Sequence, residues 1–526
     1  MTTAATAEKE TTPEPPVEAP EPGGLRAVPE VVRRRLTTLD NWLNPHSWIV
    51  TGVIVVIAAI LRLNGVSSPR GYIFDEVYYP TDAWDMLHHG VEWDEKTNSA
   101  AYVVHPPLGK WLISLGELIY GNHELGWRLM PAVAGTLMIL VLIRVAYRLF
   151  HSVLLAGLAG LLMTLDGFQL VLSRTSLLDI FLGLFVLMTF AAMVLDRDHY
   201  RRGLLRALEN GFDPEKTPAV PRIVPWWLLV SGLTFGLACG VKWSALAFAP
   251  FFAALVIVWR VQARRSAGIR GPVLAGIIGD LGWLILSLAI SFVIYLAAWT
   301  GWFVTDDGYF RHYREANGLS EPPVFGALMN LWHYHSEAYK FHSGLTERHV
   351  YQSWPWQWLL LGRPVAFYWN NGGDCGATSC AREVLLLGTP ILWWSFLPAL
   401  AALVWFGFAR RDWRAWAIGT GAVAGILPWF YYAIKDGRTM FSFYVLPALP
   451  FLILAVVYVL GAIMTPKEGI AAGPGRTDRQ LIGTIVVTAY VVAVALCFAY
   501  FYPIFVGQLI PYDSWSQRMW LGGRWI

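Results

Sequence analysis

The chain carries ionisable side chains at the ends of long apolar runs, where they could meet a substrate. Asp75 and Glu76 stand side by side in "GYIFDEVYYPTDAWDM" (71–86), directly after the first long apolar run. Ionisable residues at a membrane boundary cost desolvation free energy unless a function requires them. A cavity that holds a carboxylate pair beside several cations suits a substrate with one anionic group and one group that must lose a proton. The other candidates, expected at the same membrane face, are His105, Lys110, Arg128, Arg174, Asp179 and Lys242.

Most of these residues also have a purely structural interpretation. Arg128 and Lys242 could be basic residues that snorkel to the membrane interface. Asp179 could form a salt bridge with Arg174, five residues earlier. His105, which precedes two prolines, could only shape a loop. These alternatives stay open from the residue types alone.

The acidic pair is harder to explain by structure. Either Asp75 or Glu76 could cap the helix that follows, because carboxylates favour helix N-termini. One cap needs one carboxylate, however, and adjacent residues of a helix project about 100° apart. The pair as a pair therefore predicts a functional site.

The composition is that of an all-α integral membrane protein. Of 526 residues, 56% are hydrophobic and 15% are charged, against about 25% charged residues in a typical soluble domain. Apolar stretches of about 20 residues recur, each long enough to cross the hydrocarbon core of a bilayer. The formal net charge of +3 gives no indication of a nucleic-acid partner. We predict about eleven spans, near 48–64, 128–149, 151–167, 175–196, 226–241, 243–261, 275–303, 385–408, 414–433, 439–463 and 482–505.

Basic residues predict the orientation of these spans. Clusters of Arg and Lys fall on the side of the N-terminus, which the positive-inside rule places in the cytoplasm. With eleven spans, the C-terminus is then extracytoplasmic. Residues 1–45 are predicted to be a disordered cytoplasmic tail, because the segment begins rich in Pro, Glu and Thr and poor in large apolar residues. It lacks the short apolar core of a signal peptide, so we expect the first span to act as an uncleaved insertion signal. The basic clusters are Arg33–Arg34–Arg35; Arg197, Arg201, Arg202 and Arg206; Arg260, Arg264 and Arg265; Arg410, Arg411 and Arg414; Lys467, Arg476 and Arg479.

Two segments on the outer side, 65–127 and 304–384, are too long to be simple turns. Both are dense in Trp, Tyr and His, which suits a membrane interface. In the first segment, Pro80 opens a predicted short helix, and residues 109–121 are predicted to lie flat on the interface. We therefore divide the chain into the tail (1–45), an N-terminal catalytic module that includes the first segment (46–303), the second segment (304–384) and a C-terminal four-helix module (385–526).

The cysteines fall into two groups. Cys239 and Cys497 lie in apolar runs and are expected to be inert. Cys375 and Cys380, in "GGDCGATSC", lie in the second outer segment, in a compartment that permits oxidation. We predict a local disulfide between them, which would contribute about 2 kcal/mol to stability by closing so small a loop. The spacing is neither a CxxC redox motif nor a zinc pattern.

Five stretches resemble, in their order and spacing, the protein O-mannosyltransferase family: "FDEVYY", "HPPLGKWL", "WRLMPAVAG", "RTSLLDIF" and "CGVKWS". Members of that family are multi-span enzymes of the C-type glycosyltransferase fold. They transfer mannose from a polyprenyl-phosphate carrier to Ser or Thr of a translocated protein. Two later stretches, "FHSGLTERHVYQSWPWQWLLLGRPVAFYW" and "FSFYVLPALPF", are similar to the bacterial branch. The carbohydrate-binding-like repeat domain of eukaryotic members has no room here, which leaves acceptor selection to the membrane domain or a partner.

The resemblance implies a role for each motif residue. Asp75 resembles the catalytic base, and Glu76 completes the acidic motif. Arg128 and Lys242 match family positions near the lipid phosphate. The remaining matches, which we assign to binding of the lipid phosphate or the sugar, are His105, Lys110, Arg174 and Asp179.

The chemistry of such a transfer is consistent with these residue types. Phosphate departs as an anion, so the reaction does not need the general acid that glycosidases use on a poor leaving group. It needs one base for the attacking hydroxyl and fixed cations around the phosphate. Asp75 would supply the base and Glu76 would orient the acceptor or the sugar, while in-line attack would invert the anomeric carbon. We expect no cofactor or metal, because lysine and arginine already neutralise the phosphate of the donor, polyprenyl-phosphate-mannose.

Two other functions remain as alternatives. A related lipid-linked sugar transferase could act on a lipid or a polysaccharide. A transporter is a more distant alternative, because transporters place ionisable residues near the midplane of two related halves, whereas here they concentrate at one face. We expect a multi-pass protein of the plasma membrane, with its active site outside, that contacts membrane lipids and a Ser/Thr-containing polypeptide. A partner at the protein-export channel would fit, since acceptors would then be met unfolded.

Overall fold

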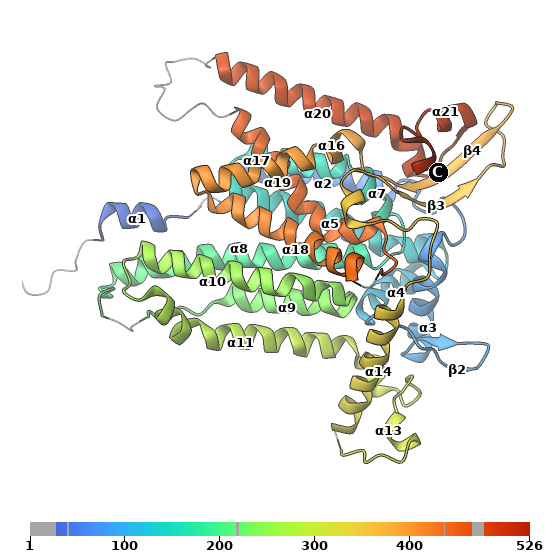
Figure 1. The fold of residues 1–526 in the computed structure, drawn as a ribbon, viewed down its shortest axis with the longest axis horizontal. Helices are drawn as coiled ribbons and strands as arrows, with labels where there is room; N and C mark the ends of the chain where they lie inside the picture. The colour runs from blue at the N-terminus through green and yellow to red at the C-terminus, as the bar shows by residue number, and fades with distance from the viewer. Residues whose placement is uncertain are drawn as a thin grey trace, which may run out of the picture.

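The computed structural model is a bundle of long helices with shorter helices and strands gathered at one end (Figure 1). Residues 1–27 and 39–41 of the predicted tail lie outside the part of the chain that the structure describes, as do Lys467 and Arg476 of the predicted basic loops. The described residues are 28–38, 42–216, 220–323, 325–435, 437–464 and 478–525.

Part of the predicted tail is helical. Glu30–Leu36 forms α1, so the prediction of disorder throughout residues 1–45 was wrong here. The reason is an apolar face, because Leu36 is buried in a small cluster with Leu204 of a later helix. Burial of this face stabilises a helix too short to persist alone.

Long apolar helices make up most of the bundle. In the N-terminal half they are α2 (Pro45–Leu63), α5 (Glu124–Phe150), α6 (Val153–Thr164), α7 (Gly167–Ser173), α8 (Asp179–Glu209), α9 (Trp226–Val241), η2 (Trp243–Phe248), α10 (Ala249–Ser266) and α11 (Pro272–Ala298). In the C-terminal half they are α16 (Pro390–Trp394), α17 (Phe396–Arg410), α18 (Trp413–Lys435), η3 (Ser442–Ala448), α19 (Leu449–Met464) and α20 (Asp478–Phe505).

These helices coincide with the predicted spans apart from their bounds. Within the described residues, nine helices are long and apolar enough to cross a membrane, and α9 is a shorter apolar helix. α6 and α7 form a further candidate that is bent by 65°. The bend lies at Asp166, whose side chain accepts a hydrogen bond from the amide of Gln169 and so caps a new helix. The exact number of spans stays a prediction.

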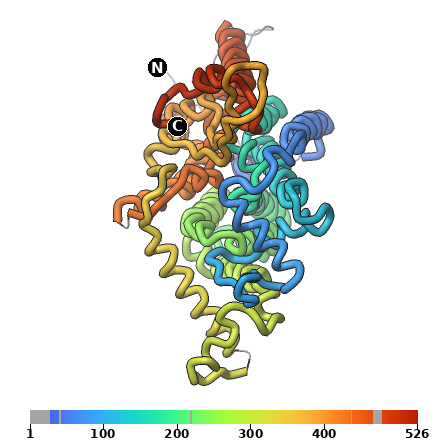
Figure 2. The backbone as a smooth tube through the Cα atoms, turned by 90° about the vertical axis from the view of Figure 1, so that its right-hand side faces the viewer, coloured from blue at the N-terminus to red at the C-terminus, as the bar shows by residue number. Residues whose placement is uncertain are grey.

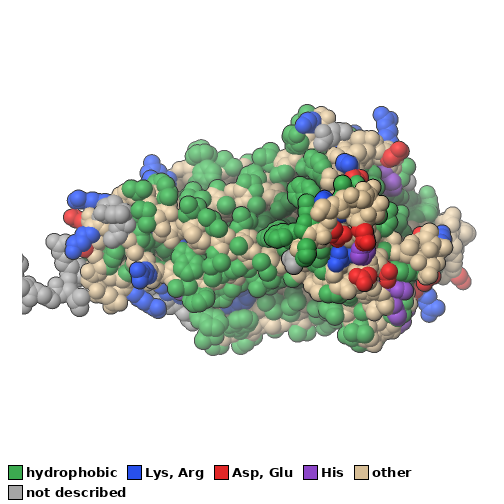
Figure 3. Space-filling view, turned by 90° about the horizontal axis from the view of Figure 1, so that it is seen from below, with side chains coloured by type: hydrophobic (Ala, Val, Ile, Leu, Met, Phe, Trp, Pro, Cys, Tyr) green, Lys and Arg blue, Asp and Glu red, His purple; other side chains and the backbone are tan. Residues whose placement is uncertain are grey.

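The burial of the helices is that of a multi-pass membrane protein. The most apolar stretches of α8 and of η3–α19 are 78% and 83% buried, whereas those of α11 and α20 are 17% and 28% buried. The peripheral helices therefore present apolar side chains outward. Figure 3 shows a belt of hydrophobic side chains between two ends where charged side chains gather. Such a belt is required where helices face hydrocarbon.

One end of the bundle, which we call the loop end, carries both long segments (Figures 1 and 2). The helices predicted after Pro80 and at 109–121 are both confirmed, although the orientation of the second in the interface stays a prediction. The first segment folds as η1 (Phe74–Val77), α3 (Tyr79–His89), the antiparallel pair β1 (Trp93–Asp94) and β2 (Ser99–Ala100), and α4 (Leu108–Tyr120).

The second segment contains a small sheet that the sequence did not predict. β3 (Val365–Asn370) and β4 (Cys380–Leu386) pair antiparallel, and β5 (Leu509–Pro511), from the C-terminal region, adds to β4. The predicted disulfide between Cys375 and Cys380 is present in the turn from β3 to β4, and Cys239 and Cys497 are free and buried. The elements are α12 (Thr300–Val304), α13 (Tyr313–Ala316), α14 (Phe325–Gly344), α15 (Pro355–Trp358), β3 (Val365–Asn370) and β4 (Cys380–Leu386), followed after α20 by β5 (Leu509–Pro511), α21 (Tyr512–Ser516) and η4 (Gly522–Arg524).

Candidate active site

The acidic pair lies in η1, at the loop end of the bundle. Phe74, which begins η1, has a left-handed φ of +49°, a conformation uncommon for a bulky side chain. Its ring stacks on Phe367 of β3 with the ring centroids 4.6 Å apart. This contact joins the unpredicted sheet to the turn and helps to hold the turn in place. Asp75 is half-buried in this turn, whereas Glu76 is fully buried.

Glu76 forms a sealed ion pair with Arg128 of α5. Both side chains have 0% exposure, and the guanidinium Nε and Nη2 donate to the two carboxylate oxygens at 2.8 and 2.6 Å. The same carboxylate accepts hydrogen bonds from the amides of Ile73 and Ser176. The rest of the guanidinium donates to backbone carbonyls of Val66, Pro69 and Gly71.

These contacts change the predicted roles of both residues. Every nitrogen of the Arg128 guanidinium is engaged, and the side chain does not line the cavity described below, so in this structure it is not placed to bind the lipid phosphate. Glu76 is likewise not placed to orient an acceptor or a sugar. Together they hold the backbone of residues 66–76, which carries Asp75, and they act as positioning residues.

Arg174 also has a positioning role. Its guanidinium lies at the end of α2 and donates to the carbonyls of Leu61, Arg62, Asn64 and Gly65 at 2.6–3.2 Å. A basic side chain that binds the last carbonyls of a helix stabilises that end. Arg174 therefore fixes the start of the loop that leads to Asp75, and it does not form the alternative salt bridge with Asp179.

Lys110 of α4 is buried within the first segment. Its ammonium pairs with Glu92 and lies 3.8 Å from Asp82 of α3. Burial raises the pKa of Asp82 to about 7, although Lys110 opposes this shift. Lys110 joins α3 to α4 and does not line the cavity described next, so the structure separates it from the predicted phosphate-binding group.

A cavity of about 430 Å³ opens at the loop end beside η1. Its walls come from the loop before α4 and from α8, η2, α14, α18 and the segment that leads into η3. Lys242 and Asp179 lie together in the wall, with the ammonium donating to a carboxylate oxygen at 2.7 Å. Aromatic side chains, including Trp243 and Trp429, form much of the rest. The charged and polar lining includes His105, Asp179, Lys242, His342, Arg438 and Tyr444.

Asp75 lies next to the Lys242–Asp179 pair, although it does not itself line the cavity. Burial raises the pKa of Asp75 to about 6, the positive charge of Lys242 opposes the shift, and the negative charge of Asp179 adds to it. Among the described residues, no side chain or backbone donor is hydrogen-bonded to its carboxylate. Asp75 is therefore an unengaged carboxylate whose pKa lies close to neutrality, as a general base requires.

Two histidines lie next to each other in the cavity wall. The rings of His105 and His342 are 5.1 Å apart between centroids. Burial lowers the pKa of His105 well below its usual value, and nearby Lys242 lowers it further. Burial likewise lowers the pKa of His342 to about 4. Both imidazoles are therefore neutral at physiological pH. The Nε2 of His342 is hydrogen-bonded to the carbonyl of Val104 at 3.0 Å, which uses the one N–H of a neutral ring and leaves its other nitrogen to accept a hydrogen bond. Both rings can contact a sugar without adding charge.

Arg438 lines the cavity and was missed by the sequence analysis. Its Nε donates to the carbonyl of His342 at 2.9 Å, and the guanidinium lies 5.6 Å from the ring of Tyr444. Its two terminal nitrogens have no hydrogen-bond partner among the described residues. Arg438 lies three residues before Phe441, where a family-like stretch begins, and a cation at a span end was the same signal that indicated Lys242.

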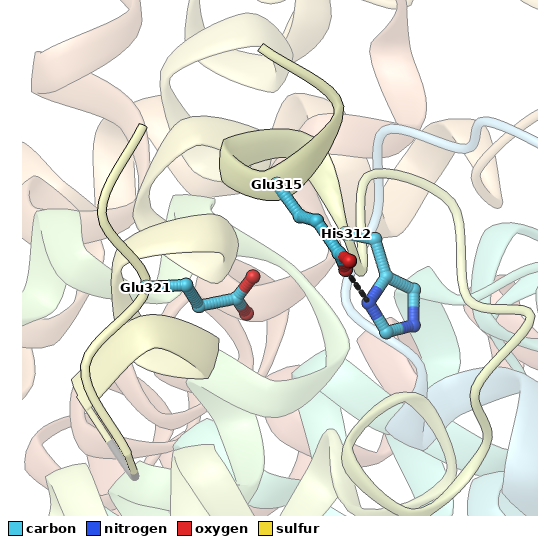
Figure 4. A group of neighbouring side chains, drawn as sticks. All are labelled: His312, Glu315 and Glu321. Carbon is cyan, nitrogen blue, oxygen red and sulfur yellow. Dashed lines mark ion pairs between the residues drawn. The ribbon is translucent and has the colours of Figure 1, made fainter. Parts of the chain in front are cut away.

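One surface cluster has the residue types of a metal site. His312 lies 3.5 Å from Glu315, and Glu321 reaches toward them from the following loop (Figure 4). His312 and Glu315 are exposed, and Glu321 already accepts a hydrogen bond from Asn330. None of the three lines the cavity, so the cluster is best described as a solvated surface group. The expectation of a metal-independent active site stays a prediction.

The fold matches that of a known membrane protein complex. The protein O-mannosyltransferase Pmt1-Pmt2 complex of S. cerevisiae, whose structure is known with the sugar donor bound, matches with a TM-score of 0.69. The match covers 94% of each chain at 15% sequence identity, and so concerns the fold alone. The chain has the fold of the C-type glycosyltransferases, which are polytopic membrane enzymes.

The sequence comparisons define the family. Residues 104–208 match the dolichyl-phosphate-mannose-protein mannosyltransferase family, and residues 327–525 match the C-terminal four TMM region of protein-O-mannosyltransferase. The chain is 38% identical over 491 residues to the polyprenol-phosphate-mannose–protein mannosyltransferase of Mycolicibacterium smegmatis (strain MKD8), with 90% of this chain and 92% of the relative covered. Its identity to the Corynebacterium glutamicum protein of the same name is 33%, with 91% and 93% covered. The chain belongs to this mannosyltransferase family.

Proposed function

We propose that the protein transfers mannose from polyprenyl-phosphate-mannose to Ser or Thr hydroxyls of polypeptides, with inversion at the anomeric carbon. The observation that carries this proposal is the unengaged carboxylate of Asp75 beside the Lys242–Asp179 pair at the cavity. The names of the relatives, which describe a polyprenol-phosphate-mannose donor and a protein acceptor, support the same pair of substrates.

Asp75 acts as the general base. Its pKa of about 6 leaves it mostly ionised at neutral pH and still basic enough to accept the proton of an attacking hydroxyl. Its position next to Lys242, but without a hydrogen bond to any described residue, keeps the carboxylate available to the acceptor. Asn at this position would keep the shape and remove the basicity.

Lys242 and Arg438 stabilise the departing phosphate. Both line the cavity, and a low-dielectric pocket makes such fixed charges more effective than they are in water. Asp179 holds Lys242 in place through their 2.7 Å contact. His105 and His342, which are neutral, contact the sugar. Since the phosphate leaves as an anion, the reaction requires no general acid, and this scheme requires no cofactor or metal.

The reaction takes place on the extracytoplasmic face of the plasma membrane. The loop end carries the cavity, and the Arg-rich ends of α8 and α10 lie at the other end of the bundle. The positive-inside rule then places the N-terminus in the cytoplasm. In this orientation an acceptor arrives from outside, and a partner at the protein-export channel would deliver it before it folds.

The test uses purified full-length protein, polyprenyl-phosphate-mannose and a Ser/Thr-rich peptide, with Asp75→Asn assayed beside the wild type. We expect mannosylated peptide from the wild type and a rate at least about 10²-fold lower from Asp75→Asn, with donor binding retained. Mass spectrometry of the peptide measures the product.

Asp307→Asn is the matched control, because Asp307 is an exposed outer-segment carboxylate away from the cavity lining. It should retain wild-type activity. Full activity of a folded Asp75→Asn protein would remove Asp75 as the base. Donor binding without transfer to the peptide by the wild type would favour a lipid or polysaccharide acceptor instead.

A further inference from the structure

A second large hollow lies at the end of the bundle opposite the active site. It has a volume of about 650 Å³ and lies between α8, α10, α17 and α18. Among the residues that the structure describes, its lining contains four arginines and no carboxylate. The residues that matter for the argument are Arg197, Arg201, Arg265, Arg411, Trp413 and Trp416.

Two of the arginines are held in the wall one turn apart on α8. The Arg197 guanidinium lies 3.4 Å from the ring centroid of Trp413 and donates to Asp198 at 3.1 Å. Arg201 donates to the backbone carbonyl of Arg35, and its Nε is buried without a hydrogen-bond partner among the described atoms. Like charges at this spacing destabilise a helix. An anion in the hollow would remove that repulsion.

The other two arginines are exposed and unpaired. Arg265 of α10 and Arg411 after α17 have no ion pair or hydrogen bond from their side chains to any described residue. Arg411 follows α17 with a left-handed φ of +50°, at a helix C-terminus where glycine is usual. Asp412, beside it, is already engaged by Arg414 at 2.6 Å. Asp198 pairs with Arg197, so the charges of the hollow that have no acidic partner among the described residues are those of Arg265 and Arg411.

The position of the hollow matches the headgroup level of a bilayer. A rise of about 1.5 Å per residue places Arg197 about 27 Å along α8 from Asp179 at the active site, close to the thickness of the hydrocarbon core. Phe408 and Trp416 line the rim and are exposed. Aromatic side chains of this kind sit at the membrane interface, and the lipid-facing surface of α17 continues from them through Trp405.

We propose that this hollow binds a phosphate-bearing anion, and the apolar rim favours the headgroup of an anionic phospholipid of the inner leaflet. Basic pockets between membrane helices bind such headgroups through combined charge and interfacial contacts. The proposal is independent of the mannosyl transfer, because the hollow lies at the other end of the bundle from Asp75. Bound lipid would fix α8 and α10 relative to α17 and α18.

The test measures binding by native mass spectrometry of the full-length protein in a neutral detergent, titrated with short-chain phosphatidylglycerol or phosphatidylcholine. We expect phosphatidylglycerol to bind more tightly than phosphatidylcholine. The double variant Arg265→Gln/Arg411→Gln should bind phosphatidylglycerol about 30-fold more weakly, since each interfacial arginine contributes several-fold. Arg410→Gln is the matched control, because Arg410 is an exposed neighbour that does not line the hollow.

Two further measurements make the result decisive. Each single variant should weaken binding by about fivefold, so a poorly folded double variant does not end the test. Displacement of phosphatidylglycerol by inorganic phosphate at constant ionic strength would support the site and assign it to a soluble phosphate, whereas resistance would support the phospholipid. Equal binding of the two lipids, or equal losses in Arg410→Gln and in the lining variants, would overturn the proposal.

Discussion

Two buried ion pairs at the loop end are formed by residues of the family-like motifs, and they differ in whether a ligand can reach them. Glu76 and Arg128 are both fully buried, and their hydrogen-bonding groups are used within the protein. Lys242 and Asp179 are joined by a single contact of 2.7 Å in the wall of a cavity. The first pair is closed to a ligand, whereas the second is open to one.

The difference shows that adjacent residues of one motif can have different roles. Asp75 and Glu76 are neighbours in sequence, yet Glu76 belongs to the sealed pair and Asp75 lies beside the open one. An ammonium has three donors, and among the described residues Asp179 is the only hydrogen-bond acceptor found for Lys242. The sealed pair therefore holds the backbone in position, and in the proposed mechanism the open pair supplies charge to the reaction.

Breaking the sealed pair should have the largest effect. Arg128→Met leaves the Glu76 carboxylate buried without its partner, and loss of one member of a buried pair costs about 3–5 kcal/mol of stability. We expect a thermal unfolding midpoint several degrees lower than that of the wild type. The measurement is a melting curve of purified protein in detergent.

The double variant Arg128→Met/Glu76→Gln is the control, because it removes the uncompensated charge and should regain part of the stability. If Arg128→Met melts like the wild type but fails to bind the donor, Arg128 does not act as a positioning residue. That outcome would return Arg128 to the phosphate-binding role implied by the family resemblance.

Breaking the open pair should affect the rate and its pH dependence more than stability. Lys242→Met removes a positive charge that lowers the pKa of Asp75, and it leaves Asp179 to raise that pKa further. The base must be unprotonated, so activity falls as the pH drops through the pKa, about 6 in the wild type. In Lys242→Met that decline should begin at higher pH, and the rate at neutral pH should fall about 10²-fold.

The measurement is the transfer rate from pH 5 to pH 8, with Lys340→Met as the matched control. Lys340 is an exposed lysine of α14 that pairs only with Glu337 in the described structure. If the pH at which the rate declines on the acidic side is the same in Lys242→Met as in the wild type, Asp75 is not the group whose titration limits the rate.

The sequence predicted the parts of the fold that depend on local pattern. The long apolar helices, the two helices of the first segment and the Cys375–Cys380 disulfide follow from runs and spacings of a few residues. The sheet was missed because "CAREVLL" (380–386) merges with the apolar span after it. Its partner β5 lies more than a hundred residues further on, and no local signal reports such a pairing.

The sequence likewise predicted only part of the site. Span ends indicated that Asp75, Asp179 and Lys242 share one face, and the structure places them together. Sequence position does not show whether the donors of an arginine are already engaged. Arg128 and Arg174 are engaged by backbone carbonyls far away in the chain, whereas no described residue engages the terminal nitrogens of Arg438.

Substitution of Arg438, which lines the cavity together with Lys242 and Asp179, should have the smallest effect of the three substitutions. The Arg438 guanidinium is half-exposed, and its terminal nitrogens have no hydrogen-bond partner among the described residues. In the proposed mechanism it therefore contacts the donor phosphate both before and during the reaction. Contacts made equally in both states change KM more than kcat. For Arg438→Gln we expect KM for polyprenyl-phosphate-mannose to rise about tenfold, the loss of one charge-assisted contact, with kcat changed less.

Steady-state kinetics with varied donor concentration measure this split, and Arg348→Gln, at an exposed arginine outside the cavity lining, is the control. Arg438→Lys should recover part of the loss, because a lysine restores the charge but not the planar fork of donors. If KM is unchanged in Arg438→Gln and the melting temperature falls instead, Arg438 belongs with Arg128 as a structural cation. Of the two cations proposed to stabilise the departing phosphate, only Lys242 would then remain.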